Sequence, residues 1–161
     1  MLVTQIALGG WTSTNYAAAA CPDFPTCQGS FWPPMDFGNG FTLWRGLGID
    51  YEGGVLEGPA RTAIHYTHRL GAYVTALVLA LVVVGAWRRG QSAGARIAAV
   101  AVAIAVPLQI AIGMNLIWRG WPLWLGTAHN AGAVLVVLSM VALLRSLSPR
   151  SGVGRFRPLG R

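Results

Sequence analysis

The feature that most limits how this chain can fold is a long apolar stretch at residues 62–87. It contains no acidic residue and no charge between Arg69 and Arg88. About 20 apolar residues are enough to cross the hydrocarbon core of a bilayer. Inside that core, every backbone N–H and C=O group has to be paired within the chain, which favours a helix. The sequence therefore predicts a membrane-spanning helix at residues 62–87.

Three further apolar stretches lie at about residues 1–17, 97–118 and 123–144, and the first is short for a span. Hydrophobic residues make up 54% of the 161-residue chain and charged residues only 11%. This composition excludes an ordinary soluble domain. We predict an all-α integral membrane protein, in which residues 1–147 form a four-helix transmembrane bundle.

The distribution of charge predicts how these helices are oriented. All five acidic residues lie within residues 18–61, whereas arginine alone carries the basic charge and gathers at 88–96 and 145–161. Arginine-rich loops stay on the cytoplasmic side of a membrane. Residues 18–61 are therefore predicted to form a long extracytoplasmic loop, with both termini in the cytoplasm and residues 148–161 as a basic, disordered tail. The arginines lie at helix ends and form no stripe, which disfavours nucleic-acid binding.

A repeated motif indicates where function is expected. The sequence H-R-L-G-A at residues 68–72 is echoed by H-N-A-G-A at 129–133. Upstream of each, Q-I-A-L-G at residues 5–9 matches Q-I-A-I-G at 109–113. The same two motifs in the same order predict that the bundle consists of two duplicated helix pairs.

The histidines of these motifs are candidate metal ligands. His68 and His129 are predicted at similar depth near the outer face, and ionisable residues inside a membrane usually mark a function. Matched histidines on neighbouring helices can ligate a haem iron from both sides, so we predict that His68 and His129 do so. His65 is either an alternative ligand, a group that supports a ligand from behind, or a group beside the haem propionates. Arg69 either neutralises a propionate or extends to the lipid headgroups.

The predicted outer loop contains both cysteines. Cys21 and Cys27 lie on the oxidising side of the membrane, where such a pair is expected to form a disulfide. Their spacing differs from the C-x-x-C-H motif of covalent haem attachment, and two cysteines alone make a poor zinc site. The aromatic residues of the loop either anchor it in the membrane interface or cover a cofactor. They are Phe31, Trp32, Phe37, Phe41, Trp44 and Tyr51.

The chain resembles the haem A synthase family, specifically the carboxy-terminal half of a proteobacterial member. The motifs that carry this resemblance are Q-I-A-L-G-G-W at 5–11, A-C-P-D-F-P-T-C at 20–27, W-P-P-M at 32–35, Y-E-G-G-V at 51–55, T-H-R-L at 67–70 and A-H-N-A-G at 128–132. They extend over nearly all of residues 1–147.

The resemblance implies a multi-pass protein of the bacterial inner membrane that oxidises a methyl group of haem O to a formyl group. The product, haem A, serves cytochrome oxidase. The resemblance also implies two four-helix halves, with haem b between His68 and His129 in the carboxy-terminal half and the substrate haem O in the amino-terminal half. In that other half a glutamate stands three residues before the first histidine, where this chain has His65. Catalytic residues are therefore not assigned here.

The resemblance leaves open how the remaining half is supplied. A missing amino-terminal half and a homo-oligomer are the alternatives, and haem O synthase is a further candidate partner beside the lipid bilayer. Two other function classes also remain open. One is a small bis-histidine b-type cytochrome that only transfers electrons, and the other is a structural membrane subunit without haem.

Overall fold

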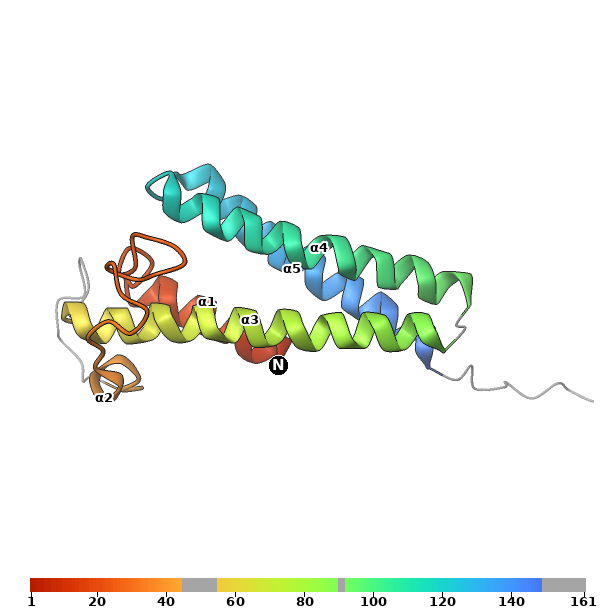
Figure 1. The fold of residues 1–161 in the computed structure, drawn as a ribbon, viewed down its shortest axis with the longest axis horizontal. Helices are drawn as coiled ribbons and strands as arrows, with labels where there is room; N and C mark the ends of the chain where they lie inside the picture. The colour runs from red at the N-terminus through yellow and green to blue at the C-terminus, as the bar shows by residue number, and fades with distance from the viewer. Residues whose placement is uncertain (45–54, 90–91, 149–161) are drawn as a thin grey trace, which may run out of the picture.

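The computed structural model describes residues 1–44, 55–89 and 92–148. In these ranges the regular secondary structure consists of helices. No strand is present among the described residues, apart from an isolated bridge between Cys27 and Ser30. The helices, shown in Figure 1, are α1 (Leu2–Thr14), α2 (Phe37–Gly40), α3 (Gly58–Arg88), α4 (Ala93–Trp118) and α5 (Leu123–Leu147). The predicted tail beyond residue 148 and most of the motif at 51–55 lie outside the described residues.

Three helices, α3, α4 and α5, are long and apolar enough to cross a membrane. This confirms the prediction of an all-helical membrane protein. The first apolar stretch differs, because α1 has only 13 residues. At 1.5 Å per residue it is about 20 Å long, whereas the hydrocarbon core is about 30 Å thick.

The long helices extend beyond the apolar stretches of the sequence, because the residues at their ends favour helix starts and helix ends. Pro59 lies in the first turn of α3, where its fixed φ suits a helix start. The Ser92 side chain caps α4 by accepting a hydrogen bond from the backbone N–H of Ala95. Arg145 lies in the last turn of α5, where a positive charge is favourable. Hydropathy therefore marks only the apolar part of each helix.

The helices form two layers that meet at one end of the molecule. In one layer α1 packs against the first half of α3, and in the other α4 packs against α5. Figure 1 shows the layers close together at the α3–α4 turn and diverging towards the outer loop. A buried apolar cluster fills the space between the layers at the end near the α3–α4 turn. Its alanine side chains are small and allow the helices to approach closely. The cluster consists of Leu79, Ala86, Ala98, Ala99, Val102, Val136 and Leu143.

Residues 18–44, the described part of the loop that follows α1, pack on the beginning of α3. Trp11 of α1 donates a hydrogen bond from Nε1 to the carbonyl oxygen of Gly40, at 3.0 Å. A side chain at Gly40 would collide with the Ala60 carbonyl of α3, only 2.8 Å from where its Cβ would lie, so this close approach requires glycine. Asp36 caps α2, and the hydrogen bonds from Asn39 hold the pKa of its carboxyl below the usual range. The loop is thereby fixed beside the outer end of the divergent layers.

Candidate functional site

His68 of α3 is held by a glutamine from α1. The Gln5 Nε2 donates to the backbone carbonyl of His68 at 2.9 Å and lies 3.0 Å from the ring Nδ1. Gly9 leaves room for the ring, because a Cβ at that position would lie 3.1 Å from His68 Cε1. Gly71 leaves room for the glutamine, because a Cβ there would overlap Gln5 Oε1.

His129 of α5 has matching contacts with α4. The Gln109 Nε2 donates to the His129 carbonyl at 2.9 Å and lies 3.2 Å from its Nδ1. A Cβ at Gly113 would lie 3.0 Å from His129 Cε1, and a Cβ at Gly132 would overlap Gln109 Oε1. Each histidine therefore has an amide from the antiparallel helix, a glycine against its ring, and a glycine beside the amide.

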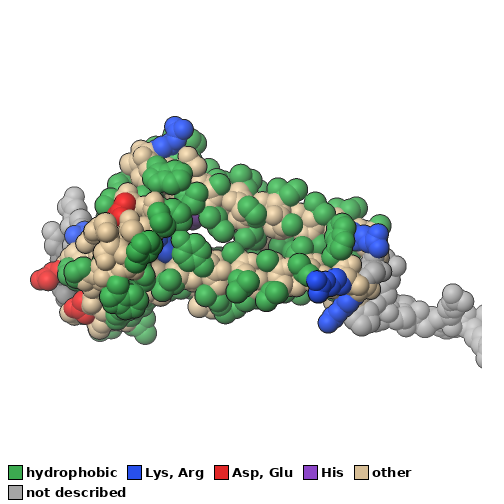
Figure 2. Space-filling model, viewed as in Figure 1, with side chains coloured by type: hydrophobic (Ala, Val, Ile, Leu, Met, Phe, Trp, Pro, Cys, Tyr) green, Lys and Arg blue, Asp and Glu red, His purple; other side chains and the backbone are tan. Residues whose placement is uncertain are grey.

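The space between the two layers is apolar and opens near the histidines. Figure 2 shows a hole between the layers, with a histidine side chain visible at its outer end. His68 and His129 are each partly buried. Further from the loop, an apolar cavity of about 490 Å³ separates α3 from α4. Its lining includes Ala76, Leu79, Val83, Val106, Ile110 and Met114.

His65 differs from the other two histidines because both of its ring nitrogens are used within the protein. It is buried, with 5% of its surface exposed. Its Nδ1 lies 3.1 Å from the carbonyl oxygen of Ala17, and its Nε2 accepts a hydrogen bond from Arg69 Nε at 3.2 Å. The carbonyl can only accept, so the ring proton is on Nδ1. No lone pair of His65 is then free for a metal.

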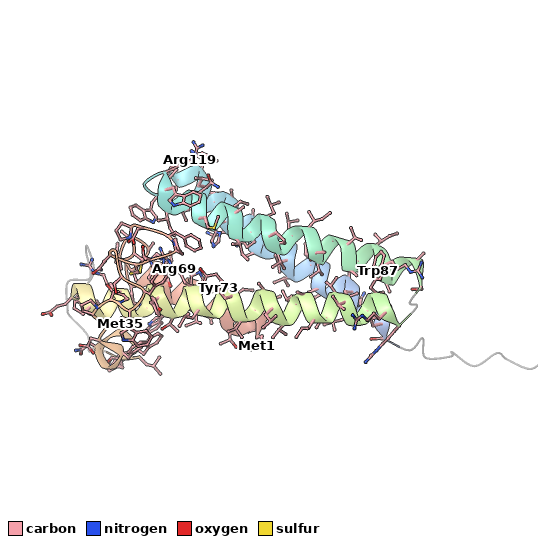
Figure 3. The ribbon with its side chains drawn as sticks, in the orientation of Figure 1. Met1, Met35, Arg69, Tyr73, Trp87 and Arg119 are labelled. Atoms are coloured by element: carbon pink, nitrogen blue, oxygen red, sulfur yellow. A yellow bond between two sulfur atoms is a disulfide. The ribbon has the colours of Figure 1, made fainter. Side chains whose placement is uncertain are left out.

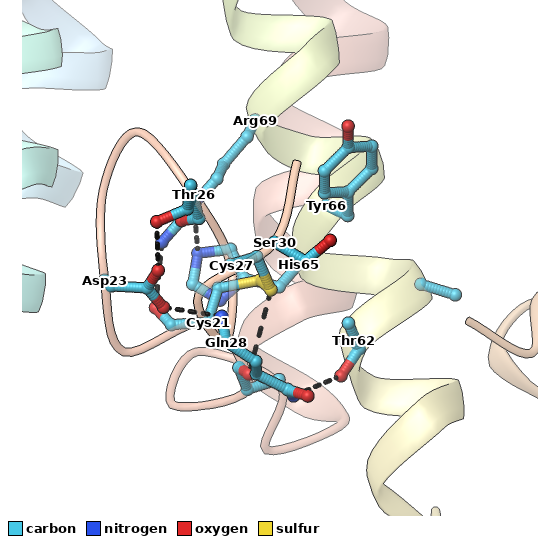
Figure 4. Close-up of a disulfide and its surroundings, with 12 residues drawn as sticks. Cys21, Asp23, Thr26, Cys27, Gln28, Ser30, Thr62, His65, Tyr66 and Arg69 are labelled. Carbon is cyan, nitrogen blue, oxygen red and sulfur yellow. Dashed lines mark hydrogen bonds between the residues drawn. A yellow bond between two sulfur atoms is a disulfide. The ribbon is translucent and has the colours of Figure 1, made fainter. Parts of the chain in front are cut away.

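Arg69 holds the disulfide loop, residues 21–27, on α3 (Figure 4). Its Nη1 donates to the Thr26 carbonyl and its Nη2 to the Cys21 carbonyl, both at 2.8 Å. The guanidinium also lies 5.7 Å from the centre of the Phe24 ring. The donors of Arg69 are thus directed at the loop and at His65, which neither sequence-based interpretation of this residue anticipated. Figure 3 shows Arg69 and Arg119 at the same end of the molecule, opposite Trp87.

The disulfide loop reaches from α3 to the outer end of α4. Cys21 and Cys27 form a disulfide, and both are fully buried. The Asp23 carboxylate accepts from Thr26 Oγ1 and from the backbone N–H groups of Gln28 and Gly29, and these bonds, that of Thr26 most, lower its pKa. Phe24 lies edge-to-face with Trp118, with ring centres 6.4 Å apart. The loop therefore bridges the two layers.

Sequence reasoning placed His68 and His129 in repeated motifs but missed what holds them. Gln5 and Gln109 belong to the repeated Q-I-A-x-G motif, and this repetition was the signal that could have assigned them. Phe24 was also missed, because the sequence analysis considered a group of loop aromatics that did not include it. Phe31 and Trp32 of that group are in fact largely exposed, at 72% and 71%.

Comparisons with known proteins agree with the resemblance noted from the sequence. The sequence model of the COX15-CtaA family, described as cytochrome oxidase assembly protein, matches residues 1–141. The haem A synthase of Shewanella oneidensis is 36% identical over 143 residues, which are 89% of this chain and 42% of that protein. The haem A synthase of Paracoccus denitrificans is 32% identical over 130 residues, 81% of this chain and 31% of that protein.

A third relative is similar to this chain over a comparable range. The haem A synthase of Methylobacterium sp. is 30% identical over 141 residues, 88% of this chain and 37% of that protein. The chain thus spans less than half the length of these curated relatives. No solved structure matches it. The family match over residues 1–141 confirms the sequence-based prediction, and the chain belongs to the COX15-CtaA family of cytochrome oxidase assembly proteins.

Proposed function

We propose that this chain is the haem b-binding part of a haem A synthase, with the iron held between His68 and His129. The observation that carries this proposal is the repeated arrangement of glutamine, histidine and glycine around both imidazoles. Family membership and the relatives named haem A synthase support it. In the whole enzyme, the reaction is the oxidation of a haem O methyl group to a formyl group.

The residues present fit a haem better than a metal ion bound by side chains alone. Among the described residues, no three histidine, cysteine or acidic side chains converge on one point. A porphyrin supplies its own equatorial nitrogens and needs only axial ligands from the protein. Gly9 and Gly113 keep the edges of the two imidazoles clear of side chains. The apolar cavity between α3 and α4 suits the hydrophobic face of a macrocycle.

We further propose that α1 with α3 and α4 with α5 are duplicated pairs, which together form a four-helix bundle. The pairing of Gln5 with Gln109 and of His68 with His129 supports this relation. Both termini are then cytoplasmic and the disulfide loop lies outside. Figure 2 supports this orientation, since acidic side chains lie at the loop end and arginines gather at the α3–α4 turn.

The chemistry proposed for this part is electron transfer. A haem iron held by His68 and His129 would supply one-electron transfer. His68 and His129 hold it, while the loop fixed by Arg69 and Phe24 covers the outer end of the space between the layers. The substrate haem O is proposed to bind in the part of the relatives that this chain does not cover. That part is supplied by an amino-terminal half or by a second copy, with haem O synthase as a further candidate partner.

One observation favours a second function, a bis-histidine cytochrome that only transfers electrons. His65 stands where the resemblance implies a glutamate in the substrate-binding half, and both of its nitrogens are engaged. It therefore offers no free acid or base. Co-expression of this chain with haem O synthase and with the amino-terminal part of a related haem A synthase distinguishes the two functions. Haem A that forms only when this chain is present supports the first function, and absence of haem A in that combination supports the second.

The experiment that tests the haem site uses His68→Ala and His129→Ala, with His65→Ala as the matched control. The purified chain is expected to show a low-spin b-type reduced-minus-oxidised spectrum. Each ligand variant should lose that spectrum, whereas the control should keep it because His65 has no free lone pair. If both ligand variants kept an unaltered low-spin spectrum at full haem occupancy, the assignment would be wrong.

A further inference from the structure

We propose that Gln5 and Gln109 are positioning residues that set the ring orientation and the proton position of His68 and His129. Each amide pairs its N–H with the backbone carbonyl of its histidine and offers its oxygen to the ring Nδ1–H when Nε2 carries iron. The inference rests on the proposed haem site. Neither glutamine touches a reacting atom, so their role is exerted through the histidines.

The contacts already present hold each ring at a defined place. The single nitrogen of the Gln5 amide is within hydrogen-bonding distance of two atoms of His68, the carbonyl oxygen and Nδ1. Gln109 makes the same two contacts with His129, and its amide nitrogen also lies 3.4 Å from the ring Nε2. A glutamine bound to both the backbone and the ring of one residue restricts the rotation of that ring. The same device occurs twice, from different helices.

The amide oxygens carry the second observation. Oε1 of Gln5 and Oε1 of Gln109 are shielded from solvent, and neither has a hydrogen-bond donor within the part of the chain that the structure describes. A buried acceptor without a donor is costly. Gly71 and Gly132 stand directly beside these oxygens, so that the amides fit only because both positions lack a side chain. The same cost at two equivalent places indicates that the oxygens have a partner in another state.

Ligation by iron creates the missing donor. Iron binds the lone pair of the imidazole Nε2, which places the ring proton on Nδ1. An amide nitrogen cannot accept that proton, but the adjacent amide oxygen can. A small rotation of the ring moves Nδ1 from the nitrogen to the oxygen. The amide nitrogen keeps its bond to the backbone carbonyl, and the buried oxygen gains its donor.

This role predicts a direction for the reduction potential. A stronger acceptor on Nδ1–H makes the imidazole a more basic ligand, which favours ferric over ferrous iron. Glutamate in place of glutamine should therefore lower the midpoint potential, and leucine, which accepts nothing, should raise it. Each tenfold change in the preference between the two iron states corresponds to about 59 mV. A merely structural role would not move leucine and glutamate variants in opposite directions.

The test uses the 161-residue chain in detergent, loaded with protohaem, and the variants Gln5→Leu, Gln5→Glu, Gln109→Leu and Gln109→Glu. We expect about 10- to 100-fold weaker haem binding in the leucine variants. The midpoint potential should be higher than that of the unmodified protein in the leucine variants and lower in the glutamate variants. Gln28→Leu is the matched control, since its amide donates to the Ala20 carbonyl and to Thr62 Oγ1 in the first turns of α3 and contacts neither His68 nor His129. Its potential should stay unchanged. If a leucine variant does not fold, the corresponding asparagine variant withdraws the amide from the ring and gives the same comparison.

The outcomes separate this inference from the proposed function. Loss of the low-spin spectrum in His68→Ala and His129→Ala, together with unchanged potentials and affinities in all glutamine variants, would overturn the positioning role alone. Leucine and glutamate variants that shift in the same direction would also overturn it. A low-spin spectrum that survives removal of both histidines would overturn the haem site itself, and this inference with it.

Discussion

The α1–α3 pair and the α4–α5 pair hold their histidines in the same way but differ at their outer ends. His65 and Arg69 of α3 connect that helix to the disulfide loop. His65 lies three residues before His68, and Arg69 directly follows His68. The corresponding positions around His129 in α5 are Gly126 and Asn130. Asn130 is exposed, and a Cβ at Gly126 would meet no atom within 4 Å among the described residues. The glutamine, histidine and glycine set is thus common to both pairs, whereas anchoring of the loop belongs to one of them.

This difference explains why one end of α3 carries so many polar groups. A charged residue in a membrane helix often marks a functional site. Here the Arg69 donors meet the carbonyl groups of Thr26 and Cys21, in a loop whose two cysteines are fully buried. The polar cluster on α3 is therefore explained by loop docking, and only His68 in it has the surroundings that His129 shares.

The largest effect should come from breaking the shared set. Gly71→Ala and Gly132→Ala each place a Cβ against the oxygen of a buried glutamine amide. We expect each to lower the free energy of unfolding by about 3 kcal/mol, the upper part of the range for overpacking. Haem affinity should also fall at least about tenfold, because the amide is displaced from the histidine. Denaturant titration and haem titration in detergent measure the two effects.

Gly126→Ala and Gly85→Ala are the controls for this prediction. A Cβ at either position would have no atom within 4 Å in the described part of the chain, so stability should change little. The comparison between the pairs fails if only one of Gly71→Ala and Gly132→Ala weakens haem binding, since the two positions should respond alike.

A smaller effect, confined to one pair, should come from Arg69→Ala. Its loss removes three hydrogen bonds made by a charged group, and we expect the free energy of unfolding to fall by about 2 kcal/mol. Proteolysis within residues 18–44 should become faster, while the low-spin haem spectrum should persist. Asn130→Ala, at the equivalent exposed position of α5, should change stability by less than about 0.5 kcal/mol. Reduced haem affinity with unchanged resistance of the loop to protease would instead favour the interpretation of Arg69 as a propionate partner.

The smallest effect should be acid weakening of the disulfide loop. The hydrogen bonds from Thr26, Gly29 and Gln28 lower the pKa of Asp23 in the folded protein. The stabilisation is therefore fully present above the unfolded pKa, about 3.9, and is lost as the pH falls through the lower folded value. Asp23 is only partly buried and solvent screens its charge, so we expect the loss of stability to be less than about 1 kcal/mol. Protease cleavage of the loop, measured against pH, should rise below about pH 4.

Asp23→Asn is the matched variant for this measurement. It should cleave faster at neutral pH and lose the acid dependence. An unchanged acid dependence in the asparagine variant would assign the titration to another group. The turn between α4 and α5 contains no acidic residue and should show no such transition.

The sequence by itself determined the class of protein, three of its long helices, its family and the pair of histidines worth testing. These properties follow from local patterns. Apolar stretches long enough to cross a bilayer, as at residues 62–87, must be helical whatever surrounds them. The repeated motifs around His68 and His129 were equally visible, because repetition needs no knowledge of contacts.

Only the tertiary structure decided which partners these residues have. Gln5 and His68 are separated by 63 positions, and Arg69 and Thr26 by 43. Which polar atoms meet over such distances depends on how α1 and the disulfide loop pack on α3, and no local pattern encodes it. His65 illustrates this most clearly, because no local pattern shows that the Ala17 carbonyl and the Arg69 guanidinium meet its two ring nitrogens.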